Sequence, residues 1–182
     1  ARYPLEVAFT AVVNDLAKPV YELDSGDGTL TGSGNVFTLD FGTTVLGSGE
    51  MHSADLSILN DVTGPADFLA GENFAEIMGS GFSSSGFLDF LGVGPGDSQG
   101  GLNVSFDSSG LLAGLFSASI VFDASSTLAG GLDAIELGDV TLNIRARIVD
   151  QTGNPVPAPA TFLLMVAGVV TLLASRRRRT AT

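Results

Sequence analysis

The sequence contains no cysteine and no tryptophan, and it has a single histidine, His52. Without cysteine, neither a disulfide framework nor a thiolate metal site can form. One histidine excludes a metal site built from two histidines. A Ser-His-Asp arrangement needs only one histidine, but no Gly-x-Ser-x-Gly turn precedes a helix in this sequence. We therefore expect His52 to be structural or solvent-exposed, and we expect no enzymatic activity.

The absence of tryptophan and the scarcity of tyrosine also bear on sugar chemistry. A glycoside hydrolase needs two carboxyl groups about 5 to 10 Å apart, and an acidic chain offers such pairs by chance. This chain has no tryptophan to stack against a sugar, and its tyrosines are Tyr3 and Tyr21. A phosphate loop is excluded as well, because the run 92–96 contains Pro95 and lacks the following lysine and helix, so a flexible connector is expected there.

Basic residues are scarce before the end of the chain. All 20 acidic residues lie before residue 151, together with only Arg2, Lys18, Arg145 and Arg147. The first 150 residues carry 4 − 20 = −16 and the remainder +4, which sum to the net charge of −12. Residues 1–150, called the body below, are negative enough to repel nucleic acid and anionic lipid, so both are disfavoured as partners. The same charge keeps an exported protein soluble.

Apolar residues recur at every second position in six segments, which is the period of a strand. One face of each segment is apolar, so we predict two antiparallel sheets packed as a sandwich, immunoglobulin-like or jelly-roll, over residues 1–150. Glycine-rich turns separate the segments. The stretch 61–90 lacks a clean period, and we expect helical turns at Pro65–Leu69 and Glu72–Ile77. The six alternating segments are Leu5–Val13, Phe37–Phe41, Ala54–Ile58, Leu102–Phe106, Phe116–Phe122 and Val140–Ile148.

The end of the chain carries three signals in a fixed order. Residues 151–159 form a linker with an extended Pro-x-Pro, because Pro157 and Pro159 fix φ and remove two backbone donors. Residues 160–175 carry no charge and would rise about 24 Å as a transmembrane helix, which flanking arginines can extend by snorkelling. Residues 176–182 are a basic tail, which the positive-inside rule puts in the cytoplasm. The apolar residues of the expected span are Phe162, Leu163, Leu164, Val166, Val169, Val170, Leu172 and Leu173.

This tail resembles the PEP-CTERM sorting signal of bacterial secreted proteins. The resemblance is carried by Val156, Pro157, Ala158, Pro159 and Ala160, the short apolar run, and the arginines Arg176, Arg177, Arg178 and Arg179. The class motif has Glu between the prolines, where this sequence has Ala158. The resemblance implies export, transient insertion in the inner membrane, and cleavage or transfer near the Pro-x-Pro by an exosortase-type enzyme. The alternative from hydropathy alone is a permanent C-terminal membrane anchor.

The body, from Val36 to Val149, resembles the choice-of-anchor β-sandwich modules of bacterial surface proteins. The resemblance is carried by Phe37–Gly42, Ala54–Asp61, Gly100–Asp107 and Thr141–Ile144. It implies a β-sandwich at the cell surface and names no catalytic residue. The resemblance of the tail to the sorting signal implies in addition an extracellular matrix, with extracellular polysaccharide as a partner. Because the numbering begins at Ala1 without Met, we expect that a secretory signal has been removed or that the sequence is a fragment.

Two other interpretations of the body stay open. Asp24, Ser25 and Asp27 form an acidic glycine-rich turn that could bind Ca²⁺, although the turn lacks the ligand spacing of an EF-hand loop. No cofactor is otherwise expected. The body would then be a Ca²⁺-dependent or carbohydrate-binding module held by a permanent anchor. Alternatively, it could assemble into fibres through exposed sheet edges.

Overall fold

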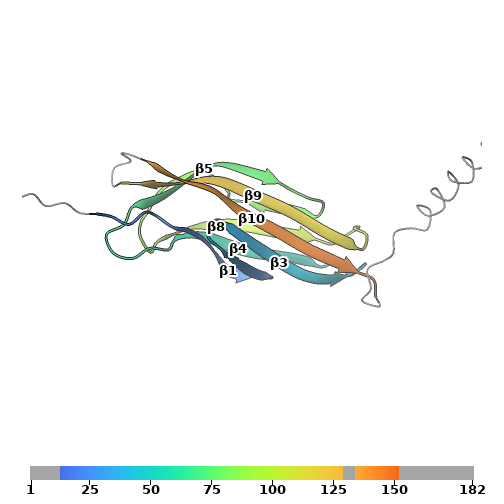
Figure 1. Cartoon of the computed structure of the whole chain (residues 1–182). Coiled ribbons are helices and arrows are strands. Elements are labelled where there is room, and N and C mark those ends of the chain that lie inside the picture. The colour runs from blue at the N-terminus through green and yellow to red at the C-terminus, as the bar shows by residue number, and fades with distance from the viewer. Residues whose placement is uncertain (1–12, 129–133, 152–182) are drawn as a thin grey trace, which may run out of the picture.

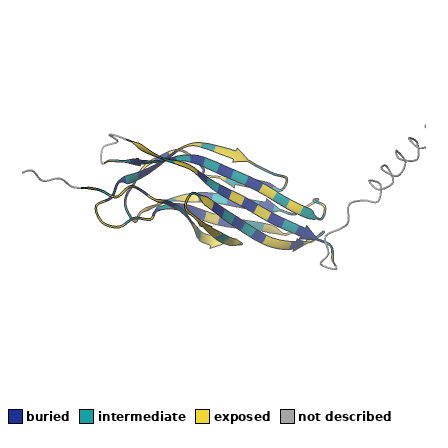
Figure 2. Cartoon of the chain, in the orientation of Figure 1, coloured by how far each residue is buried: buried dark blue, intermediate teal, exposed yellow. Residues whose placement is uncertain are grey.

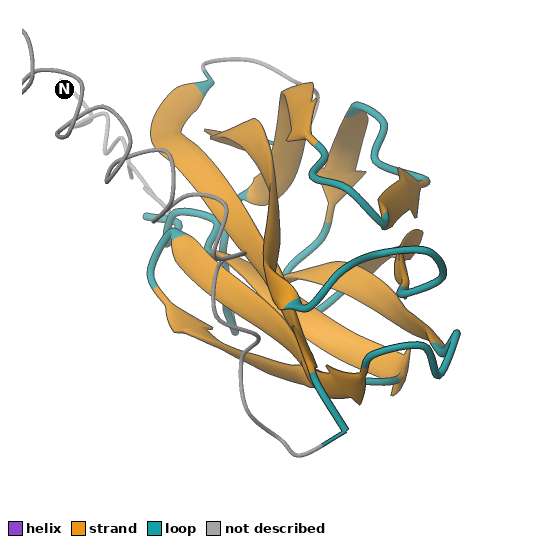
Figure 3. Ribbon diagram, turned by 90° about the vertical axis from the view of Figure 1, so that its right-hand side faces the viewer, coloured by secondary structure: helices purple, strands orange, loops and turns teal. Residues whose placement is uncertain are grey.

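The computed structural model describes residues 13–128 and 134–151, which form two β-sheets stacked face to face (Figure 1). Figure 3 shows that loops and turns, without a helix, join the strands in this part of the chain. The strands are β1 (Pro19–Gly26), β2 (Thr29–Ser33), β3 (Val36–Val45), β4 (Met51–Asn60), β5 (Phe68–Ile77), β6 (Phe82–Ser85), β7 (Phe90–Val93), β8 (Ser98–Asp107), β9 (Gly114–Thr127) and β10 (Ile135–Val149).

One sheet has the strand order β1-β4-β8-β6 and the other has the order β2-β3-β10-β9-β5-β7. Nearly all pairs are antiparallel, as predicted, but β3 and β10 are parallel, with Asn143 opposite Thr38. The prediction of purely antiparallel sheets is therefore wrong at this pair. Alternating hydrophobicity reports which face of a strand is buried, and it carries no information on the direction of the neighbouring strand.

The core lies between the inward faces of the two sheets. Five predicted strands are confirmed as β3, β4, β8, β9 and β10, and Figure 2 shows buried and exposed residues alternating along them. In β10, for example, Val140, Leu142 and Ile144 are buried, while the residues between them face outward. Burial of such side chains contributes about 1.5 to 3 kcal/mol each. One continuous cluster of apolar side chains therefore holds the two sheets together.

The stretch 61–90 forms strands β5, β6 and β7, so the predicted helical turns are wrong. Leu69 and Gly71 face the core, but Asn73 has a positive φ of 56° and the register with β9 shifts between Glu72 and Ala75. Such a bulge shifts the inward positions along the strand, which hides its two-residue period in the sequence. Val93 of β7 is also buried, so part of the expected connector 92–96 belongs to the sheet.

A fully buried amide joins the strands at one end of the sandwich. Asn60 Nδ2 donates to the carbonyl oxygens of Asp67 and Val93 at 3.0 and 3.1 Å, and Asn60 Oδ1 accepts from the backbone N–H of Lys18 at 3.0 Å. Every polar atom of this buried side chain has a partner, so its hydrogen bonds offset the cost of desolvation while they fix the entries of β1 and β5 and the exit of β7.

Several predicted segments lie outside the described residues. These are the first predicted strand up to residue 12, the linker from residue 152, the expected membrane span 160–175 and the basic tail 176–182. In the ranges 13–128 and 134–151, no helix is long and apolar enough to cross a membrane.

Candidate functional site

The acidic glycine-rich turn predicted from the sequence lies where the chain passes from one sheet to the other. β1 ends at Gly26, and Asp27 and Gly28 lead into β2. Gly26 has a φ of +96°, and a Cβ atom added there would lie 2.2 Å from the carbonyl oxygen of Ser53. The N–H of Asp27 donates to that same oxygen at 2.7 Å. Only glycine allows β1 to approach β4 so closely here, and this approach places Asp27 beside β4.

The two candidate calcium ligands of this turn accept hydrogen bonds from different residues of β4. Asp24 Oδ1 accepts from the Ser57 hydroxyl at 2.8 Å, whereas Asp27 Oδ2 accepts from the N–H of Ser53 at 3.2 Å. Within residues 13–128 and 134–151, no group of three or more His, Asp or Glu side chains is placed to hold a metal ion. Protein donors already occupy oxygens of both carboxylates, so Ca²⁺ binding at this turn remains a sequence-based prediction.

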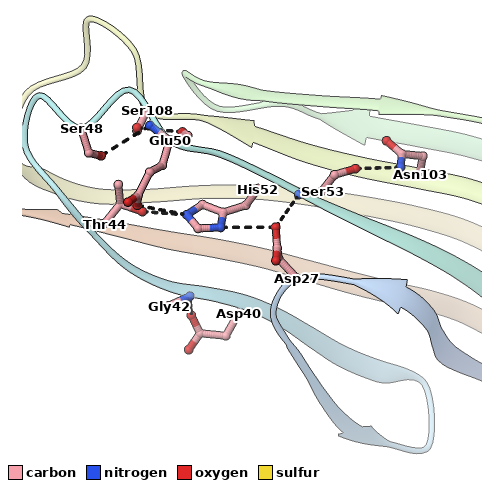
Figure 4. Close-up of polar contacts among 10 residues, drawn as sticks. All are labelled: Asp27, Asp40, Gly42, Thr44, Ser48, Glu50, His52, Ser53, Asn103 and Ser108. Carbon is pink, nitrogen blue, oxygen red and sulfur yellow. Dashed lines mark hydrogen bonds and ion pairs between the residues drawn. The ribbon is translucent and has the colours of Figure 1, made fainter.

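His52 lies next to Asp27, a proximity that the sequence did not indicate (Figure 4). Its Nδ1 is 3.5 Å from Asp27 Oδ2, and its Nε2 is 2.8 Å from the hydroxyl oxygen of Thr44 and 3.9 Å from Glu50 Oε2. The imidazole stacks on the ring of Phe41 with a centroid distance of 6.0 Å. Phe41 and Thr44 belong to β3 and His52 to β4, so the imidazole bridges the two sheets.

The order carboxylate, imidazole, hydroxyl is that of a nucleophile relay, but the geometry does not suit catalysis. Thr44 is only 2% exposed, so its hydroxyl cannot meet a substrate carbonyl in this arrangement. The carboxylate and imidazole atoms are also 3.5 Å apart, beyond a normal hydrogen bond. What the arrangement does provide is a polar connection between the sheets, half-shielded from water.

Polar side chains continue across the outer face of the four-stranded sheet. Asp55 accepts hydrogen bonds from Asn103 and Ser25, both at 2.8 Å, and these bonds lower the pKa of its carboxyl group. The hydroxyl groups of Ser83 and Ser105 lie 2.7 Å apart on the next strand pair. The face is therefore hydrophilic, and the negative charge of Asp55 is held by neutral hydrogen-bond donors of the same sheet.

The outer face of the six-stranded sheet is hollowed around Arg145. Its Nε and Nη2 both lie 2.9 Å from Asp40 Oδ2, and the parallel register of β3 and β10 places the two residues side by side. Hollows of about 390 and 540 Å³ meet at Ser117 and Arg145. Sequence reasoning missed this face, because its residues come from strands whose neighbours only the tertiary structure fixes.

The residues predicted to carry the sorting signal, 156–160 and 176–179, and those predicted to span the membrane, 162–173, lie outside the described residues. A comparison with protein-family models and a comparison with curated proteins find no match to this chain. The functional assignment therefore depends on the chemistry of the sequence and on the fold of the body.

Proposed function

We propose that this chain is an exported, non-enzymatic surface or extracellular-matrix protein, delivered by a C-terminal signal that a membrane enzyme of exosortase type processes. The observation that carries the proposal is the order of the tail: Pro157-x-Pro159, an uncharged apolar run, and four terminal arginines. This order supplies an extended peptide for recognition, a segment for insertion and a charge block for orientation.

The body is consistent with this role. Its two sheets share one apolar core and leave two hydrophilic outer faces, and the acidic composition favours solubility outside the cell. In the described part of the chain, the relay-like group Asp27, His52 and Thr44 has its hydroxyl buried. We assign the body to the choice-of-anchor kind of sandwich, immunoglobulin-like or jelly-roll in its finer topology, with a transmembrane helix after it.

The intact mass of the protein recovered from its native host tests this proposal. We expect a mass that ends near residues 155–160, with or without an added group, in the surface fraction or the medium. A full-length mass confined to the membrane fraction would contradict processing and would leave the permanent-anchor alternative.

Variants of the tail sharpen the test. We expect Pro157→Ala combined with Pro159→Ala to leave the full-length protein in the membrane, because the recognised peptide is no longer held extended. Pro155→Ala is the matched control, since Pro155 lies just outside the motif and its replacement should leave processing intact. Equal processing of both variants would show that the Pro-x-Pro is not recognised.

A further inference from the structure

Charge changes sign along the outward face of β10. Asp139, Thr141, Asn143, Arg145 and Arg147 alternate with buried Val140, Leu142, Ile144 and Ala146, so all five side chains lie on the outer surface of the six-stranded sheet. Asp139 and Arg147 are eight residues apart, about 27 Å along the strand. One strand therefore carries an acidic end and a basic end, separated by neutral positions.

The acidic end is a row of carboxylates on adjacent strands. The register places Asp139 opposite Asp123 of β9, and Asp123 opposite Glu72 of β5. Asn73 donates to Asp123 at 2.8 Å, but no basic side chain of the described residues pairs with this row. Like charges directly opposite one another destabilise a sheet, so the row gains from an external positive group.

The basic end has a side chain that forms no ion pair with any residue in the ranges 13–128 and 134–151. Lys18 pairs with Asp61, and Arg145 pairs with Asp40, which leaves Arg147 without an ion pair in the described part of the chain. Arg147 is half-buried at the rim of the larger hollow. An arginine in this position can form a directional ion pair with an approaching carboxylate.

Between the two ends, the rows through Thr141 and Asn143 carry no charged side chain, and the second of these rows lines the smaller hollow. Small or β-branched side chains dominate, and two apolar ones are notably exposed, Ile77 at 71% and Val36 at 55%. Such a surface lets a second sheet approach to the usual distance of about 10 Å. The two central cross-strand rows are Val36, Thr141, Val121 and Ala75, followed by Thr38, Asn143, Ser119 and Ile77.

We propose that this face binds the same face of a second copy of the chain, around a two-fold axis near Asn143. A two-fold rotation reverses β10, so Arg147 of each copy faces the Asp139 row of the other, and the charge pattern is complementary to itself. Twisted sheets stack at an angle of about 30°, which displaces Arg147 of one copy sideways relative to β10 of the other. Because the acidic row spans three strands, Arg147 still faces a carboxylate after this displacement.

The available area suits a weak, reversible dimer. On rows about 6.7 Å apart and strands about 4.8 Å apart, β9 and β10 supply five positions each, β3 four and β5 three, which cover about 550 Å² on each copy. The total of about 1,100 Å² lies just below the range of stable complexes, where transient contacts are found. Repulsion between two acidic bodies opposes the contact, so the ion pairs at both ends determine whether it forms.

A charge-swap experiment tests the pairing. The full chain in a density-matched nonionic detergent is studied by sedimentation equilibrium, as Arg147→Glu, as Asp139→Lys, and as their mixture. We expect each variant alone to dimerise about ten-fold more weakly than the unmodified chain, since like charges then meet at both ends. In the mixture, the two introduced charges face each other at one end and the native Asp139 and Arg147 face each other at the opposite end. A heterodimer should therefore recover the original affinity.

The control mixture combines Arg147→Glu with Glu22→Lys. Glu22 is exposed on β1, in the other sheet, and its replacement changes the net charge by the same amount as Asp139→Lys. Glu22→Lys keeps the proposed face and should dimerise with itself, so Arg147→Glu carries a fluorescent label in both mixtures and only its association is followed. Labelled Arg147→Glu should regain dimerisation with Asp139→Lys but not with Glu22→Lys. Equal association of the labelled chain in both mixtures would overturn the proposal, because it would reflect net charge or contacts of the common tail.

Chemical cross-linking tests whether the two-fold axis of the proposed dimer lies near Asn143. The chain has no cysteine, so Asn143→Cys can react with a short bismaleimide only between copies. We expect it to cross-link at least about ten-fold faster than Ser105→Cys, which lies on the outer face of the other sheet. Equal rates would overturn the proposal. So would a monomer that binds a carboxylated polysaccharide through Arg147, since the face would then serve a glycan.

Discussion

The hydroxyl of Thr44 and Nε2 of His52 lie 2.8 Å apart, and this contact joins β3 of one sheet to β4 of the other. Replacing Thr44 with Val keeps the shape but leaves the half-buried imidazole nitrogen without its nearest partner. We expect the free energy of unfolding to fall by about 1 kcal/mol. Urea denaturation measures it, with Thr44→Ser as the variant that retains the hydroxyl. A loss equally large in Thr44→Ser would show that packing of the methyl group, and not the hydrogen bond, matters.

Tyr21 carries a buried hydroxyl group that has no hydrogen-bond partner within the described residues. Its ring packs edge-on against Phe37 and Phe122 in the core. Tyr21→Phe removes the unsatisfied group and keeps the ring, so we expect stability to stay equal or to rise by about 1 kcal/mol. Thermal unfolding at neutral pH checks this, and a loss of more than about 1 kcal/mol would indicate a bound water at the hydroxyl.

The same hydroxyl predicts a dependence of stability on alkaline pH. Burial raises the pKa of Tyr21 above its ordinary value near 10. Above pH ~10 the unfolded chain releases this proton while the folded chain retains it, so stability should fall as the pH rises. Tyr21→Phe should remove that loss. Absorbance titration of a Tyr3→Phe variant, in which Tyr21 is the only tyrosine left, measures the ionisation directly.

Gly26 should tolerate no side chain. Its positive φ, and the distance of only 2.2 Å that would separate an added Cβ atom from the carbonyl oxygen of Ser53, predict that Gly26→Ala costs about 2 to 4 kcal/mol of unfolding free energy. Gly34→Ala is the matched control, because Gly34 also has a positive φ but nothing lies within 4 Å of its Cβ position. We expect about 1 kcal/mol there. Equal losses would mean that backbone strain, and not the contact with β4, sets the cost.

Asp55 and Asp107 should contribute to acid unfolding. Hydrogen bonds from Asn103 and Ser25 lower the pKa of Asp55, and the backbone N–H and the side chain of Ser109 lower that of Asp107. A lowered pKa gives stability that is present above about pH 4 and is lost as the pH falls through the folded-state value. In Asp55→Asn, stability should therefore depend less steeply on pH below about 4. Acid titrations followed by circular dichroism compare Asp55→Asn and Asp107→Asn with the unmodified chain, and an unchanged slope in both variants would contradict the prediction.

The strands with a clean period were predictable and the irregular ones were not. Leu102, Val104 and Phe106 alternate without interruption, and β8 forms where the pattern indicates. In β5 the extra residue at Asn73 moves the inward positions, so the pattern suggested helical turns although the chain stays extended. Period analysis assumes a constant two-residue repeat, and a bulge violates that assumption.

The candidate sites were likewise predictable only where their residues are close together in the sequence. The turn at Asp24 and Asp27 was visible because its residues are adjacent in sequence, but its proximity to His52 arises from the packing of β1 against β4. The row of Glu72, Asp123 and Asp139 was invisible, since its members lie on three strands whose register no local pattern specifies.

By itself, the sequence determined the all-β class, the inward face of most strands, the acidity of the body and the order of signals in the tail. These properties follow from local periodicity and composition, which act on neighbours along the chain. Only the tertiary structure decided the parallel pairing of β3 with β10, the contact of Thr44 with His52, and the alignment of Glu72, Asp123 and Asp139 in one acidic row. Each of these depends on the register between strands distant in sequence, which is set when one shared core is packed.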